Sequence, residues 1–194
     1  MDLLDIYSDK LPAIDKISDL KAIWTAAETL DTVVLRPIGY SVYAETRSML
    51  ISAYSTLISS LIHRTQQNFE SMLKLYQWDN TSQKDPLLKF GGVSVLYNNC
   101  VYVVNEVRGF RVEEVGAGLV TDMGEMLSNV AKFVVVRGQH LRGPGPRTPQ
   151  QNVYRTLFFD FLDTLRKSAF PALISAITDT FPALPPSPDF VFPT

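Results

Sequence analysis

The longest regular pattern in this sequence is a stripe of apolar residues within residues 41–76. The stripe consists of Leu50, Tyr54, Leu57, Leu61, Phe69, Met72 and Tyr76. Apart from a gap around Thr65, its members recur in steps of three and four residues, which is the period of an α-helix. The stripe therefore predicts one long helix, or two helices in line, and a chain that is mainly helical.

Three further segments show the same helical period: residues 8–30, residues 121–135 and residues 153–181. We expect Pro171 to interrupt the last of them, because proline lacks the backbone N–H that a helix interior uses. Residues 138–149 contain three glycines and three prolines, so they predict a loop.

Other segments favour strands. Two runs rich in valine and tyrosine within residues 93–104 flank the pair Asn98 and Asn99, a residue type that tolerates the positive φ of a tight hairpin turn. Residues 110–115 would add a third strand, and the β-branched residues 32–35 a short separate one. The predicted fold class is therefore α+β: a predominantly helical single domain with a small antiparallel sheet around this hairpin.

The chain has the size of one ordinary domain. Its 194 residues are long enough to bury a sizeable core, and 46% hydrophobic against 20% charged residues excludes the composition of disordered chains. We expect one globular α+β domain over residues 1–181, followed by an extended, proline-rich C-terminal arm over residues 182–194.

Composition also indicates the cellular compartment in which the protein is expected. The single cysteine, Cys100, cannot form an internal disulfide, and residues 1–5 carry neither a basic region nor a long apolar run. The net charge of −2 provides no global attraction to nucleic acid or membrane. These features predict a cytoplasmic protein without a membrane segment, found in the virion if the protein is viral.

Catalytic and metal-binding signatures are not evident in the sequence. His63 and His140 are the only histidines, and their spacing with Cys100 matches neither a tetrahedral zinc set nor a Cys-His pair. We therefore expect no cofactor, no bound metal and no enzymatic activity.

One segment is unusually basic, because no acidic residue lies between Glu125 and Asp160. Its candidate anion-binding residues are Lys132, Arg137, His140, Arg142, Arg147 and Arg155. Long basic side chains beside a glycine- and proline-rich loop suit contacts to the phosphates of RNA or of another polyanion. The alternative is a solvated loop whose charges keep it away from the core or pair with the acidic N-terminal helix.

Small hydroxyl residues suggest an interface on the long central helix. Ser52, Ser55 and Ser59 stand where an isolated surface helix would carry lysine and glutamate. Because interface centres are poor in charge, this face could pack against another subunit. The alternative is a helix buried on several sides within its own monomer.

The C-terminal arm offers a second means of association. Its candidate residues are Pro182, Pro185, Phe190, Val191 and Phe192. Proline stiffens such an arm and lowers the entropy lost when its apolar end binds a groove on an adjacent copy. Two alternatives are a PxxP ligand for a partner protein and an arm that folds onto its own core.

Together these features favour a non-enzymatic structural or assembly protein that forms a homo-oligomer. A viral coat or nucleocapsid subunit whose basic loop contacts RNA is the foremost version of this hypothesis. The alternative is an intracellular adaptor or effector that binds a partner protein through its proline-rich tail. An enzyme with scattered active-site residues is the third.

Overall fold

The computed structural model describes residues 10–74, 85–139 and 148–182. Helices make up 89% of these residues, and no strand occurs among them. In chain order the α-helices are α2 (Ile17–Thr29), α3 (Tyr43–Lys74), α4 (Gly91–Gly109), α5 (Glu113–Arg137), α7 (Pro149–Thr164) and α8 (Phe170–Thr180). The predicted α+β fold is therefore wrong, and the described part of the chain is all helical.

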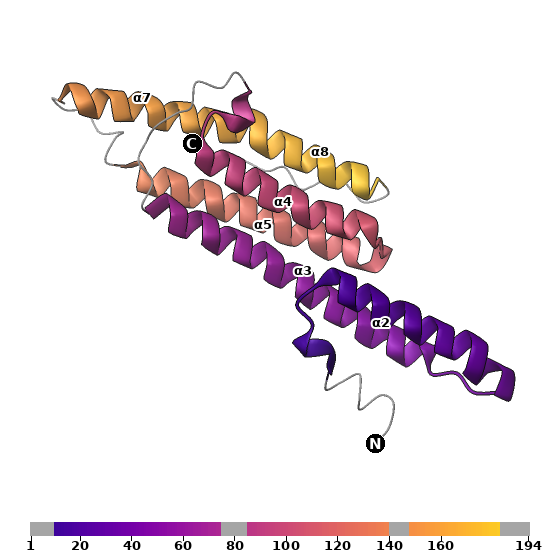
Figure 1. Cartoon of the computed structure of the whole chain (residues 1–194). Helices are drawn as coiled ribbons and strands as arrows, with labels where there is room; N and C mark the ends of the chain where they lie inside the picture. The colour runs from indigo at the N-terminus through magenta and orange to yellow at the C-terminus, as the bar shows by residue number, and fades with distance from the viewer. Residues whose placement is uncertain (1–9, 75–84, 140–147, 183–194) are drawn as a thin grey trace.

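Helix α3 is the central element and confirms the long helix predicted from the apolar stripe (Figure 1). Helices α4 and α5 pack along it, α2 packs on its N-terminal half, and α8 covers α4. The buried side of α3 consists of Thr46, Leu50, Tyr54, Leu57, Ile58, Ile62, Thr65, Phe69 and Leu73. One helix with a continuous apolar side thus organises the other helices around it.

The predicted hairpin at Asn98 and Asn99 is wrong, because both residues lie within helix α4. The buried residues of α4 are Gly92, Val93, Leu96, Cys100, Val103, Val104 and Val107. These positions follow the helical period, and their burial outweighs the local preference of valine and tyrosine for strands. The third strand predicted over residues 110–115 is wrong as well, since α5 begins at Glu113.

The strand predicted over residues 32–35 is wrong because helix α2 continues beyond its expected end. It passes into a π-helical segment, η2 (Leu30–Leu35), and then into a 3-10 turn, η3 (Arg36–Ile38). Gly39 ends the turn with a φ of 84°, a conformation that glycine adopts without steric cost. The chain then enters α3.

The helix predicted over residues 8–30 consists of two parts in its described portion. A short 3-10 turn, η1 (Leu11–Ala13), is separated from α2 by extended backbone at Ile14 and Lys16. Leu11 and Ile17 are both buried, and the bend between them allows each to reach the core.

The prediction that Pro171 interrupts its helix is wrong. A π-helical segment, η5 (Leu165–Ala169), joins α7 to α8, and Pro171 lies in the first turn of α8. Because a π turn alters the hydrogen-bond register, the chain stays helical around a residue that has no N–H. Of the predicted loop over residues 138–149, residues 140–147 lie outside the described residues.

Candidate interaction surface

The connection between α2 and α3 exposes a group of large apolar side chains. Val33, Val34, Ile38 and Tyr40 are 67%, 50%, 66% and 69% exposed, and we call these four residues the apolar tip. In Figure 1 the α2–α3 pair extends past the turn that joins α4 to α5, with the tip at its far end. The apolar tip is therefore a projection of the molecule.

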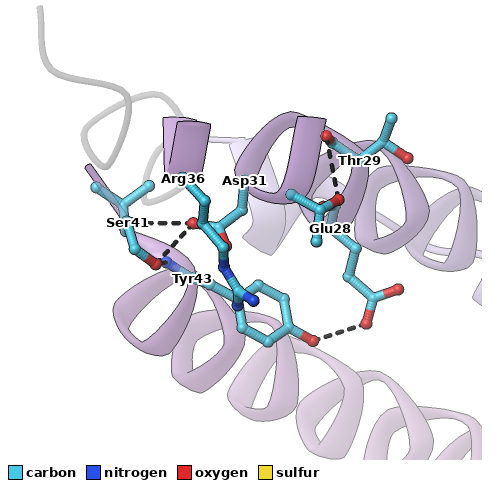
Figure 2. Close-up of polar contacts among 8 residues, drawn as sticks. Glu28, Thr29, Asp31, Arg36, Ser41 and Tyr43 are labelled. Carbon is cyan, nitrogen blue, oxygen red and sulfur yellow. Dashed lines mark hydrogen bonds and ion pairs between the residues drawn. The ribbon is translucent and has the colours of Figure 1, made fainter. Parts of the chain in front are cut away.

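A buried carboxylate holds the connection in shape. Asp31 accepts hydrogen bonds from Arg36 Nε at 2.6 Å, Ser41 Oγ at 2.8 Å and the backbone N–H of Val42 at 3.2 Å (Figure 2). Burial alone would raise the pKa of Asp31, but the hydrogen bonds from Ser41 and Arg36, the charge of Arg36 and the N–H of Val42 keep it below its ordinary value. The ionised carboxylate thus ties both ends of the connection together.

The same ion pair removes net charge from the projection. Asp31 and Arg36 are the only charged residues within residues 29–44, and they pair with each other. The tip therefore combines exposed apolar side chains with a fixed backbone and no net charge, which are properties of a surface that can be desolvated on binding.

Further polar contacts anchor the projection to the rest of the molecule. Glu28 accepts hydrogen bonds from Trp24 Nε1 at 3.0 Å and from the Tyr43 hydroxyl at 2.6 Å, and Figure 2 shows the second of these. Burial, together with the bond to Glu28, raises the pKa of Tyr43. Arg47 on α3 pairs with Glu114 on α5. The base of the projection is thus tied across three helices.

Two hollows of about 470 and 400 Å³ lie beside these contacts and share Thr25, Glu28 and Tyr43. The arginines that line them are each paired with a carboxylate: Arg36 with Asp31, Arg47 with Glu114, and Arg111 with Glu113. Because these charges are already compensated within the chain, the hollows are poorly suited to hold an anion.

A larger groove of about 610 Å³ lies between η1 and α3, and we call it the α3 groove. Its lining consists of Leu11, Pro12, Ala13, Ile14, Asp15, Ser48, Met49, Ser52, Ala53, Thr56, Leu57, Ser60 and Arg64. Hydroxyl residues at four-residue spacing form one row of the α3 side, and Met49, Ala53 and Leu57 form an apolar row beside it. The only charged lining residues are Asp15 and Arg64.

The three serines predicted to form a helix interface have different surroundings. Ser52 is exposed and lines the α3 groove. Ser59 donates a hydrogen bond to the carboxylate of Asp122 on α5, and Ser55 is half-buried. Only Ser52 of these three thus belongs to the open groove, while Ser59 joins two helices of the same chain.

Three of the predicted anion-binding residues lie within the described residues. Arg137 donates a hydrogen bond at 2.8 Å to the carbonyl oxygen of Lys74 at the end of α3, and the Arg155 guanidinium lies 5.5 Å from the centre of the Phe159 ring. Lys132 is exposed on α5. His140, Arg142 and Arg147 lie outside the described residues. The described segment thus shows two arginines with contacts inside the chain.

Of the predicted arm, Pro182 is exposed just beyond α8, and Pro185, Phe190, Val191 and Phe192 lie outside the described residues. The residue before the arm, Phe181, is buried, with the guanidinium of Arg111 5.5 Å from its ring centre. The point from which the arm starts is therefore fixed to the helical body.

The residues that the structure describes include no cluster of three or more metal-ligating side chains. Burial raises the pKa of the Cys100 thiol to about 12, which keeps it protonated at neutral pH. Among the described helices, none is long and apolar enough to cross a membrane.

The apolar tip was missed by sequence reasoning, which assigned residues 32–35 to a strand. The sequence carries only part of the signal, an apolar run whose two charges, Asp31 and Arg36, are close enough in sequence to pair, because the exposure of that run depends on the tertiary structure. The described residues thus define an all-helical protein with one apolar projection and one open groove. Comparison with protein-family models, with curated proteins and with solved structures finds no match for this chain.

Proposed function

We propose that this protein is a non-enzymatic structural protein that associates with copies of itself. The observation that carries the proposal is the apolar tip, where four of the large exposed apolar side chains occur within residues 33–40. Single exposed apolar residues are ordinary, whereas four within eight residues of one projecting connection are typical of an interaction site. Burying such a patch yields about 25 cal/mol per Å² of apolar surface.

The rigidity of the projection supports the same proposal. Three donors to the Asp31 carboxylate fix the connection before any partner binds. A surface held in its bound shape loses less conformational entropy on association. A flexible loop with the same residues would associate more weakly.

A coat or nucleocapsid role extends this proposal to RNA or another polyanion. The supporting observation is the absence of acidic residues between Glu125 and Asp160, where Lys132 and Arg155 are positively charged. Phosphate contacts of this kind are independent of base sequence and weaken as salt is added.

Sedimentation equilibrium over a wide range of protein concentration tests self-association. We expect the average mass to exceed the 21.7 kDa of one chain and to rise with concentration. Because the proposed contact is apolar, ammonium sulfate should strengthen it. A mass of 21.7 kDa at every concentration, with or without sulfate, would overturn the proposal.

A further inference from the structure

We propose that the apolar tip of one copy binds in the α3 groove of a second copy. This inference rests on the proposed self-association and names the two surfaces that meet. One is an apolar projection, and the other is a hollow with an apolar row and a row of small hydroxyl groups. Both occur on every chain, so no other component is needed.

The size and charge of the groove suit the tip. Its volume of about 610 Å³ lies within the range of about 300–1,000 Å³ that encloses small-molecule ligands, so it can take several side chains. The tip brings no net charge, because Asp31 and Arg36 neutralise each other. The two charged lining residues of the groove, Asp15 and Arg64, have opposite signs, so the contact joins two surfaces that each carry no net charge.

The tip lies outside the groove of its own chain. The connection enters α3 at Tyr43, whereas Ser52 and Ser60 line the groove farther along the same helix. The α3 part of the lining runs from Ser48 to Arg64, and with a rise of about 1.5 Å per residue it begins about 8 Å from the start of α3. None of the four tip residues is among the residues that line the groove, so we assign the tip that binds there to a second copy.

The resulting contact is heterologous, because two different surfaces meet. Each pairing leaves one unused tip and one unused groove, so further copies can add at both ends. The expected products are rings or open chains of copies, and their mean size increases with concentration.

Two variants separate the two surfaces. Ile38→Asp places a charge on the apolar tip, and Ser52→Arg fills the α3 groove with a long charged side chain. Both positions are exposed, so we expect each variant to fold. The matched controls are Val153→Asp, on an exposed part of α7, and Ser71→Arg, on an exposed part of α3 outside the groove.

Sedimentation of the two variants, alone and mixed, gives the decisive result. Each variant alone should be monomeric, while both controls should assemble like the wild type. An equimolar mixture should form a heterodimer and nothing larger, because the intact tip of Ser52→Arg fits the intact groove of Ile38→Asp. Circular dichroism of each variant verifies that its helices are retained.

Other outcomes overturn the inference in distinguishable ways. If the wild type assembles and either variant assembles equally well, the contact uses another surface, although self-association stands. If both variants are folded monomers and their mixture stays monomeric, tip and groove do not bind each other, and the groove holds a different occupant. A wild type that is monomeric throughout would remove the proposed function as well.

Discussion

Tyr54 on α3 donates its hydroxyl hydrogen to the carbonyl oxygen of Phe110 at 2.7 Å, and their ring centres lie 5.1 Å apart. Phe110 lies between α4 and α5, and its ring also meets Trp24 of α2 edge-on at 5.3 Å. Tyr54 is fully buried, and this burial, with a smaller contribution from the charge of Glu106, raises its pKa. Phe110 thus joins the connection between α4 and α5 to both α3 and α2.

Tyr54→Phe should therefore destabilise the protein by about 1–2 kcal/mol, because the Phe110 carbonyl loses its side-chain donor in a partly buried site. Urea unfolding followed by circular dichroism measures the change. Tyr102→Phe is the control, since Tyr102 is 57% exposed on α4 and should change stability little. Equal effects in both variants would show that the Tyr54 hydrogen bond contributes nothing.

The Asp31 carboxylate makes stability depend on pH. Its pKa in the folded state is below its ordinary value of about 3.9, so its contribution is fully present above that pH and is lost as pH falls through the folded pKa. Glu114, which pairs with Arg47, has a lowered pKa and acts in the same direction.

In Asp31→Asn, stability at neutral pH should be lower, and the loss on acidification below about pH 4 should be smaller than in the wild type. Urea midpoints measured at a series of pH values test this. Asp179→Asn, at an exposed position on α8, is the control and should leave the acid-induced loss unchanged. An unaltered acid profile in Asp31→Asn would refute the role given to Asp31.

Replacing either of two glycines with alanine should change the stability of the protein, and in opposite directions. A Cβ at Gly138 would overlap the buried ring of Phe158, so Gly138→Ala should destabilise the protein by about 1–3 kcal/mol through overpacking. At Gly118, inside α5, a Cβ meets no atom within 4 Å, so Gly118→Ala should stabilise it by about 0.5–1 kcal/mol. Thermal and urea unfolding of both variants measure the change in the free energy of unfolding. If both variants are stabilised, or both are destabilised, the packing described at Gly138 or the open space at Gly118 is contradicted.

Anion binding by the basic segment is tested separately from folding. Arg137 contacts the end of α3, so the test variant keeps Arg137 and carries the double change Arg142→Ala and Arg147→Ala. Fluorescence anisotropy with single-stranded RNA should show binding that weakens with salt. The slope of log K against log salt should fall by about 0.7 for each phosphate that the double variant no longer neutralises.

Arg166→Ala is the matched control for RNA binding, because Arg166 is exposed but lies outside the basic segment. It should bind RNA like the wild type. If the wild type shows no salt-dependent RNA binding, or if the salt slope of the double variant is unchanged, RNA is not a ligand of this segment.

Strand-like composition misled the interpretation of residues 93–104. Val101, Val103 and Val104 have high strand propensity, yet Cys100, Val103, Val104 and Val107 form the buried side of a helix. Local propensity differs by less than about 1 kcal/mol per residue, whereas burial of one such side chain contributes about 1.5–3 kcal/mol. Packing against α3 and α8 therefore decides the conformation of residues 91–109.

The sequence by itself determined that residues 43–74 form a helix, because an apolar stripe of helical period stabilises a helix in any packed environment. It also determined the helical character of most of residues 121–135 and 153–181, for the same reason. Tertiary structure alone decided which apolar residues stay exposed. Val33 and Ile38 are residue types that are usually buried, yet in the connection that extends beyond α4 and α5 they are 67% and 66% exposed.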